Sequence, residues 1–253
     1  MKFSIITCTY NSERYLQKNI DSIKNQTFRD FEHIFIDGFS TDKTMEIIEK
    51  YRQEFPEKVK VFQFPAKGIG NAMNEGIKKS SGEYLIHLHS DDSLFSNSIL
   101  EKVSEFIKKY KNPNWIYGKA KFINEKAKDI LVVPHRKIYQ KARFWLLLMT
   151  NYIPHQSVFI KKEIFEKFGN FNEYYKNSMD YEMWLRFTKN KIPSTFINEI
   201  ICNFSVRDDS LSSQNKNNCK NENILIIKKY ANNKIIQHIL SIIIRINFLR
   251  NFF

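Results

Sequence analysis

Residues 84–92 have the sequence YLIHLHSDD, an apolar run that leads directly into two carboxylates. The apolar part predicts a buried strand, because short apolar runs bounded by turn residues are typical of strands inside a sheet. The turn His89-Ser90-Asp91-Asp92 would then lie at the edge of that sheet. Hard oxygen ligands such as Asp91 and Asp92 favour Mg²⁺ or Mn²⁺, which can bridge to a diphosphate. Adjacent Asp residues after a strand are also common in ordinary turns.

Upstream of this strand, short apolar runs alternate with segments of helical periodicity. The predicted strands cover residues 3–7, 32–36, 59–64 and 83–88, and the predicted helices lie between or after them. This alternation predicts an α/β fold with a mostly parallel central sheet flanked by helices. In open sheets of this class, ligands bind beyond the carboxyl ends of the strands.

Polar turns follow all four predicted strands, so they would converge on one edge. Thr9 and Tyr10 offer polar contact and stacking, and Asp37 can accept hydrogen bonds from a base or from ribose hydroxyls. Lys67 precedes the flexible Gly68 and a helix N-terminus, an arrangement that suits a diphosphate. Each turn taken alone is also compatible with a purely structural role.

After residue 110 the pattern changes. Residues 115–117, 121–124 and 130–133 are predicted to form antiparallel strands, 153–160 another strand, and the apolar segment 144–149 is too short to span a bilayer. A helix is predicted to start near Ser178, with Asp180 in its first turn. A carboxylate there could deprotonate an acceptor hydroxyl. The alternative role is a first-turn acid that interacts favourably with the helix dipole.

Composition narrows the class of protein. The chain has 40 Lys and Arg against 27 Asp and Glu, a net charge of +13. This excess favours phosphate-bearing ligands, anionic membranes or nucleic acid, although a solvated basic surface explains it equally well. Without a nucleic-acid-binding motif, we predict no nucleic-acid partner. Three scattered cysteines and an N-terminus that lacks a signal-peptide pattern predict a cytoplasmic protein.

Taken in order, several segments resemble the inverting glycosyltransferases of family 2, whose catalytic domain has the nucleotide-binding GT-A fold. The resemblance covers most of residues 1–190. It is carried by SIITCTYN at 4–11, IDGFSTDKT at 36–44, GIGNAMNEGI at 68–77, SDD at 90–92 and DYEMWLR at 180–186. Within the family, the segments at 37–40 and 68–77 look closest to bacterial enzymes that build capsule, exopolysaccharide or lipopolysaccharide.

The resemblance implies a role for each candidate residue. Thr9, Tyr10 and Asp37 would hold the nucleoside, Asp91 would contact ribose or metal, Asp92 would help to bind metal, and Asp180 would be the base. The implied donor is UDP-linked, the implied cofactor is Mn²⁺ or Mg²⁺, and the acceptor is lipid-linked or an oligosaccharide.

Two positions depart from many relatives, which carry acids at Gly38 and His89. His89 could ligate a softer divalent ion, or it could only line the pocket. The departures also motivate an alternative, a catalytically inactive GT-A-fold protein that binds sugar nucleotide or glycan.

The domain organisation follows from these patterns. Residues 1–207 are predicted to form the catalytic domain, with a nucleotide-sugar-binding half at 1–110 and an acceptor-binding half at 111–207. Residues 208–221 are predicted to be a polar loop, and 222–253 a basic, apolar helical region. That last region could contact the inner face of the cytoplasmic membrane peripherally, or pack on the catalytic domain or on a second subunit.

Overall fold

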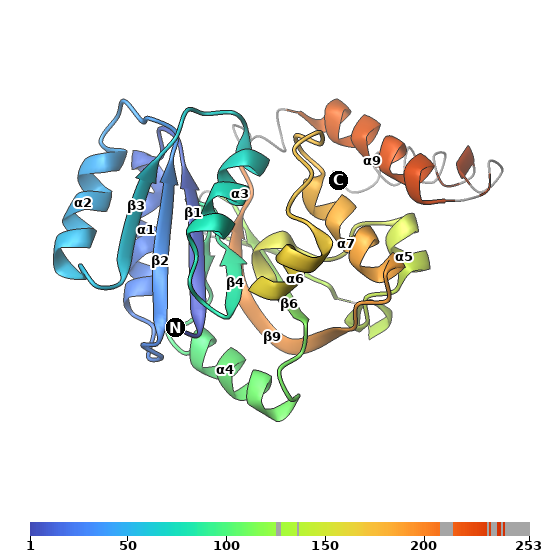
Figure 1. Cartoon of the computed structure of the whole chain (residues 1–253), viewed down its shortest axis with the longest axis horizontal. Helices are drawn as coiled ribbons and strands as arrows, with labels where there is room; N and C mark the ends of the chain where they lie inside the picture. The colour runs from blue at the N-terminus through green and yellow to red at the C-terminus, as the bar shows by residue number, and fades with distance from the viewer. Residues whose placement is uncertain are drawn as a thin grey trace.

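The computed structural model describes residues 1–124, 128–135, 137–207 and 215–231, together with 233, 237, 238 and 240. These residues form one mixed sheet of nine strands, with helices packed on both of its faces (Figure 1). The strands are β1 (Phe3–Thr9), β2 (Phe31–Asp37), β3 (Val59–Gln63), β4 (Tyr84–His87), β5 (Ser93–Leu94), β6 (Trp115–Ile123), β7 (Asp129–Val133), β8 (Val158–Lys161) and β9 (Ser194–Ser205). The α-helices are α1 (Glu13–Lys24), α2 (Thr44–Glu54), α3 (Ile69–Lys79), α4 (Ile99–Lys109), α5 (Phe144–Met149), α6 (Lys162–Phe168), α7 (Met179–Lys189) and α9 (Lys216–Tyr230), and two 3₁₀ turns are η1 (Lys137–Gln140) and η2 (His155–Ser157).

The first four predicted strands form the parallel half of the sheet, in the order β3-β2-β1-β4. Every residue of β1 and β2 is buried, as expected for parallel strands that are covered on both faces. Alternate side chains of β1 and β2 point to opposite faces of the sheet, so the core has a part on each face. Ile5 and Phe35 face the side covered by α1, α2 and α4, whereas Ile6 and Ile36 face α3. The α/β prediction is confirmed for this half.

The helix α3 lies unusually close to the sheet. A Cβ atom on Gly76 would be only 2.3 Å from Cγ2 of Ile6 in β1, so only glycine fits there. This close approach fixes the N-terminus of α3 at the carboxyl edge of the sheet, beside the end of β1.

The second half of the sheet is mixed. Across the whole sheet, four strand pairings are parallel and four are antiparallel. The antiparallel pairing predicted after residue 110 is confirmed between β6 and β7, whereas β6 pairs with β9 in parallel. The strands predicted at 115–117 and 121–124 are one continuous strand, β6, with an irregular register near Gly118. A Cβ there would meet Cγ1 of Ile201 in β9 at 2.5 Å, which explains the local need for glycine.

Two further segments differ from their predictions. The strand predicted at 153–160 begins only at Val158, because residues 155–157 form η2 directly after Pro154. The strand β9 was not predicted, since its side chains alternate poorly between polar and apolar. The apolar segment 144–149 forms the short helix α5.

The C-terminal region starts earlier than predicted. The helix α9 begins at Lys216, inside the segment 208–221 that was predicted to be a loop. It packs on α7 through buried side chains that include Ile226 and Ile227, so it extends the catalytic core. Most of residues 232–253 lies outside the described residues. Within the described part of the chain, no helix has the length and apolar character that crossing a bilayer requires.

Candidate functional site

A cavity of about 840 Å³ opens beyond the carboxyl ends of β1, β2 and β4. Its volume lies in the range typical of small-molecule sites. The side chains predicted for the site all line this one cavity, although they come from both halves of the chain. They are Thr9, Tyr10, Asp37, Lys67, His89, Asp91, Asp92 and Asp180.

Asp37 lies at the end of β2 and is fully buried. One carboxylate oxygen accepts hydrogen bonds from Thr9 Oγ1 at 2.9 Å and Ser40 Oγ at 2.5 Å. The other accepts from the Ser40 backbone N–H at 2.9 Å and from Gln63 Nε2 at 3.1 Å. Four donors therefore hold this carboxylate rigidly, and it in turn fixes the ends of β1, β2 and β3 relative to one another.

Tyr10 forms the outer wall next to Asp37. Its side chain is 62% exposed, so its ring face is accessible to a stacking partner. The adjacent Gly38 accounts for one departure from the family pattern. A Cβ at Gly38 would lie 3.0 Å from Tyr10 Cδ2 and 3.3 Å from Ala66 Cβ. An acid at this position would therefore require the Tyr10 ring or the loop at Ala66 to shift.

Lys67 and Gly68 lie at the N-terminus of α3, on the cavity wall. Gly68 has a φ of +102°, a left-handed conformation that glycine adopts without strain. The helix begins at the next residue, Ile69. A lysine beside the unpaired N–H groups of a helix N-terminus gives this wall a positive potential that suits an anion.

The turn at residues 89–92 is hydrogen-bonded to α1. Asn19 Nδ2 donates to the backbone oxygens of His89 at 2.9 Å and Asp92 at 3.1 Å. Asp92 is buried and accepts a hydrogen bond from the Ser205 backbone N–H at 2.8 Å. Burial, reinforced by the charge of Asp91, raises the pKa of Asp92 well above its usual value. Asn19 was missed at the sequence level because nothing in the helix pattern marks it.

Asp91 forms an ion pair with Arg207, which donates from Nε at 3.1 Å and from Nη2 at 2.8 Å. The Arg207 guanidinium lies 3.9 Å from the centre of the Tyr15 ring, within cation–π range. Arg207 also lines the cavity. It was missed because it follows β9, a strand that the sequence pattern did not reveal.

The carboxylates of Asp91 and Asp92 are the candidate ligands for a divalent cation. Among the described residues, no three His, Cys, Asp or Glu side chains converge as a metal-binding group. Asp91 and Asp92 nevertheless lie side by side on the cavity wall. Such a pair fits Mg²⁺ or Mn²⁺ when the ligand's own phosphates complete the coordination, as is common at nucleotide sites. A site built from protein ligands alone does not fit.

His89, the further candidate ligand, belongs to a column of histidines. Its ring stacks on His155 with the ring centroids 5.4 Å apart, and His155 lies 5.6 Å from His87. Burial lowers the pKa of His89, opposed in part by the charge of Asp91. Burial lowers the pKa of His155 well below its usual value. These rings therefore favour the neutral form and give the cavity an uncharged, aromatic wall.

Asp180 faces the cavity from the first turn of α7, which begins next to Ser178 as predicted. Its carboxylate accepts from the Tyr181 backbone N–H at 2.7 Å and from Asn151 Nδ2 at 3.4 Å. Burial, with a smaller contribution from the charge of Glu222, raises the pKa of Asp180 to about 6. A carboxyl group with a pKa in this range is well suited to proton transfer near neutral pH.

Glu222 reaches the same region from α9. Its two carboxylate oxygens accept three backbone N–H bonds, from Lys176 at 2.8 Å and from Asn177 and Ser178 at 2.9 Å each. The segment just before α7, which carries Asp180, is thereby tied to the C-terminal helix. This contact was not predicted, because residues 222–253 were expected to form a separate region.

Glu182, one turn along α7 from Ser178, is a structural residue. Its buried carboxylate accepts from Tyr230 Oη at 2.6 Å and from Lys229 Nζ at 2.8 Å, both on α9. It therefore faces away from the cavity side of α7 and joins the two helices.

Two solved structures have a similar fold. Staphylococcus aureus TarS 1–349 in complex with UDP-GlcNAc matches with a TM-score of 0.70 at 19% identity, over 95% of this chain and 70% of that one. The mannosyltransferase PcManGT from Pyrobaculum calidifontis, in complex with GDP-Man and Mn²⁺, matches with a TM-score of 0.68 at 15% identity, over 96% and 69%. At these identities the likeness concerns the fold, and it confirms the predicted GT-A architecture.

The sequence comparisons go further. A PGL/p-HBAD biosynthesis glycosyltransferase of Mycobacterium tuberculosis is 28% identical over 206 residues, which make up 80% of this chain and 76% of that protein. Residues 4–182 match the family profile described as Glycosyl transferase family 2. Because this match covers well over half of the 253 residues, the chain belongs to glycosyl transferase family 2.

Proposed function

We propose that the chain transfers a sugar from a UDP-linked donor to a hydroxyl group of a bacterial surface-glycan precursor, with inversion at the anomeric carbon. The observation that carries this proposal is the position of Asp180. It is an acid with a raised pKa, and it lines the same cavity as the nucleotide-facing residues Tyr10, Asp37 and Lys67. One cavity therefore holds both a place for the donor and a candidate base for the acceptor.

Most of the residues that would bind the nucleotide-sugar donor come from the first half of the chain. Tyr10 stacks against the base, and the Asp37 network fixes the turn that accepts the base or the ribose. Lys67, the N-terminus of α3 and Arg207 attract the diphosphate. Arg207 exchanges its bonds to Asp91 for bonds to the phosphate oxygens, so donor binding releases Asp91 into the cavity.

The residue that would activate the acceptor lies on α7. Asp180 accepts the proton of the acceptor hydroxyl as its oxygen forms a bond to the anomeric carbon. The bond between that carbon and the diphosphate oxygen breaks in the same step, and the electron pair leaves with the nucleoside diphosphate. A single displacement of this kind inverts the configuration.

Asp91 and Asp92 would hold the cofactor, with His89 as a further candidate that lies next to them. When bound, Mn²⁺ or Mg²⁺ supplies Lewis-acid stabilisation of the negative charge on the leaving diphosphate. The Mn²⁺ named with the similar mannosyltransferase supports this assignment.

The acceptor is proposed to be a lipid-linked or oligosaccharide precursor of capsule, exopolysaccharide or lipopolysaccharide. The bacterial sequence relative, which is named for a biosynthetic glycosyltransferase, supports this class of acceptor. We place the reaction in the cytoplasm, with peripheral attachment to the inner face of the cytoplasmic membrane.

The test is a donor panel of UDP-sugars with Mn²⁺ or Mg²⁺ and an acceptor panel of lipid-linked and oligosaccharide glycans. Asp180→Asn is expected to lower kcat by about 10²–10⁴-fold, the usual contribution of a general base. The thermal stabilisation by UDP should survive in this variant. Asp30→Asn, at a carboxylate that is 59% exposed, is the matched control. Unchanged turnover in Asp180→Asn contradicts the base assignment.

A second candidate function is distinguished by the same experiment. If the wild-type chain binds UDP but turns over no donor with any acceptor, the protein is a sugar-nucleotide-binding member of the family without activity. The departures at Gly38 and His89 are the features that favour this alternative.

A further inference from the structure

Exposed apolar side chains are concentrated in one short stretch of the chain, residues 130–149. This stretch contributes exposed residues from β7, from η1 and from α5, which are Ile130, Leu131, Ile138, Trp145 and Met149. Scattered exposed apolar residues are normal, whereas large apolar side chains exposed together on one element mark an interaction surface, as Trp145 and Met149 are on α5. Figure 1 shows α5 beside α7, at the end of the molecule away from α2.

Trp145 and Met149 form the outermost part of this surface. They are four residues apart in α5 and therefore lie on the same side of the helix. Their side chains are 65% and 44% exposed, whereas Leu147 and Leu148 are fully buried on the opposite side. The helix thus packs on the protein with one face and presents an aromatic and a thioether side chain outward.

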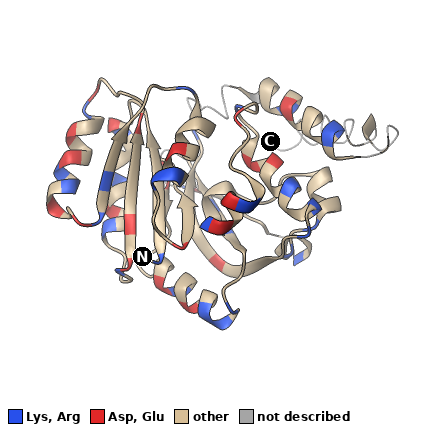
Figure 2. Ribbon diagram, viewed as in Figure 1, with Lys and Arg blue, Asp and Glu red and all other residues tan. Residues whose placement is uncertain are grey.

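The same stretch is strongly basic. Residues 128–149 contain five Lys or Arg and a single acid, Asp129, a net charge of 5 − 1 = +4. Asp129 is paired with Lys121 at 2.8 Å. Among the residues that the structure describes, no carboxylate pairs with Lys137, Lys141 or Arg143. Figure 2 shows basic positions around α5 and the end of α7.

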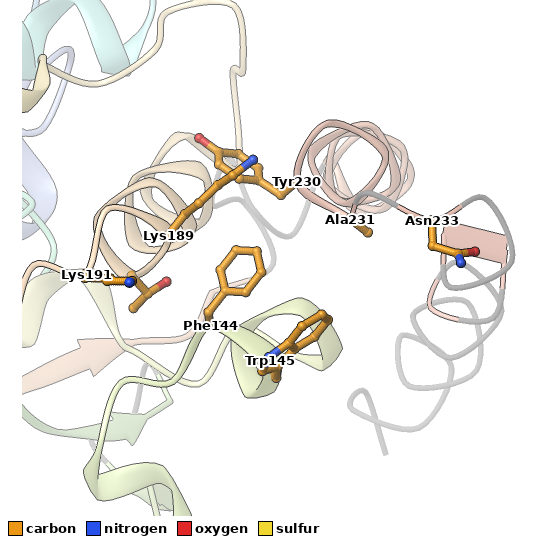
Figure 3. A pocket seen from close by; sticks show the side chains of 8 residues that line it. Phe144, Trp145, Lys189, Lys191, Tyr230, Ala231 and Asn233 are labelled. Carbon is orange, nitrogen blue, oxygen red and sulfur yellow. The ribbon is translucent and has the colours of Figure 1, made fainter.

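A cavity of about 390 Å³ lies beside Trp145, between α5, the end of α7 and the end of α9 (Figure 3). Phe144, Trp145 and Tyr230 supply aromatic walls, and Lys189 and Lys191 supply two cations. Neither lysine forms an ion pair with any carboxylate in the described part of the chain. This combination suits an anionic group attached to an apolar body.

We propose that α5 and the adjoining cavity form a membrane-binding surface that recognises anionic phospholipid headgroups. Trp145 and Met149 enter the interface between headgroups and acyl chains, where aromatic side chains are favoured. Lys189 and Lys191 bind the headgroup phosphate in the cavity, and the basic stretch at 128–149 is attracted to the negative surface. The side chains that form this surface end at Asn233, so they include only the start of the region 222–253 for which membrane contact was predicted.

This orientation has a consequence for catalysis, which rests on the proposed function. The chain leaves α5 at Met149, and Asn151 contacts Asp180 two residues later. Attachment through α5 therefore places the catalytic cavity next to the bilayer, where a lipid-linked acceptor would be presented. Lipid binding itself does not depend on transferase activity and is measured separately from it.

The three tryptophans provide a specific test. Trp115 and Trp184 are fully buried, so Trp145 is the one that reports on the surface. Full-length protein is titrated with vesicles of phosphatidylcholine alone, or of phosphatidylcholine with phosphatidylglycerol. With phosphatidylglycerol we expect a blue shift of the emission, quenching by brominated acyl chains, and weakening by added salt. No response to these vesicles overturns the proposal.

Two double variants locate the surface by vesicle co-sedimentation. Trp145→Ser with Met149→Ser removes the apolar contact, and Lys189→Glu with Lys191→Glu reverses the cations. Each is expected to weaken binding by about tenfold or more, because both apolar burial and charge contribute. The matched control is the exposed end of α4, where Lys108→Glu with Lys109→Glu changes the same charge next to Tyr110, which is 49% exposed.

Three outcomes overturn the proposal. The first is unchanged binding in both double variants. The second is loss of binding with Arg245→Glu and Arg250→Glu in otherwise wild-type protein while the α5 variants still bind, which assigns the contact to the C-terminal segment. The third is equal thermal stabilisation by soluble glycerol 3-phosphate and by vesicles, which points to a free phosphate ligand.

Discussion

Each half of the chain places one aspartate in the same cavity, but the two carboxylates differ in how many hydrogen bonds they accept. Asp37, from the parallel half, is fully buried and accepts four hydrogen bonds. Asp180, from the mixed half, accepts two, one of them from Asn151 at the long distance of 3.4 Å. The number of donors, and not the type of residue, separates the rigidly held carboxylate of Asp37 from the less constrained carboxylate of Asp180.

The physical reason is the balance between burial and hydrogen bonding. Burial disfavours a charged carboxylate, and each donor that points at it favours the charge again. At Asp180 the effect of burial dominates and raises the pKa to about 6. The carboxyl group can therefore both lose and accept a proton near neutral pH. At Asp37 the donors come from Thr9, Ser40 and Gln63, and they lock the side chain in place.

After the loss expected for Asp180→Asn, the next largest effect is expected from pH. Asp180 acts as a base only when it is deprotonated, and its pKa is about 6. Below pH 6, kcat/KM should therefore fall by about tenfold per pH unit, with an upper plateau above pH 7. The profile of kcat/KM against pH measures this directly. A profile that is flat down to pH 4.5, with the fold intact, would remove Asp180 from the role of base.

The fold must be monitored in the same experiment. Burial lowers the pKa of His33 and of His87 to about 3, below the value in an unfolded chain. The unfolded state then binds protons that the folded state does not, so stability decreases as pH falls below about 6.5. Circular dichroism at each pH separates this loss of structure from loss of the base.

An intermediate effect is expected from Asp37→Asn. The amide replaces one acceptor oxygen with a donor, which would face the donors of Ser40 and Gln63. We expect the free energy of unfolding to fall by about 1–3 kcal/mol, the usual cost of unsatisfied buried groups. Urea unfolding measures the change, with the exposed Asp30→Asn as control. Unchanged stability together with lost UDP binding would show that Asp37 serves the ligand more than the fold.

The smallest effect is expected from Glu222→Gln, which probes how the C-terminal helix supports Asp180. The amide can keep its oxygen on the N–H groups of Asn177 and Ser178, and it then turns a donor toward the N–H of Lys176. We expect kcat to fall by about tenfold or less, an energy near that of one hydrogen bond. Removal of the charge should also move the acid limb of the pH profile to lower pH. Glu199→Gln, at a surface ion pair, is the control. A fall in kcat without a shift of the limb would indicate only a general loosening of α7.

Sequence patterns were most informative where structure is local. The four parallel strands and the start of α7 at Ser178 follow from short apolar runs and a helix boundary, and both are confirmed. The polar turns could be placed on one edge because parallel strands share a direction. The predicted site residues accordingly line one cavity, although their individual roles stay predictions.

Residues that act across the chain were missed. Asn19, Arg207 and Glu222 reach the site from α1, from the end of β9 and from α9. None belongs to a local motif, and β9 itself has no clear alternation. For the same reason α9 was assigned to a separate region, although its buried face and Glu222 make it part of the support for Asp180.

The sequence by itself determined the α/β class, the family, and the set of polar turns that end the parallel strands. Only the tertiary structure decided that Asp37 accepts four hydrogen bonds and Asp180 two, and that Asp91 is paired with Arg207. It also placed an exposed tryptophan beside Lys189 and Lys191, neither of which pairs with a carboxylate among the described residues. Periodicity and turn chemistry depend on residues that are neighbours in the chain, so they can be recognised from the sequence alone. A pKa, an ion pair or a surface depends on groups that lie far apart in the chain and meet only in the folded molecule.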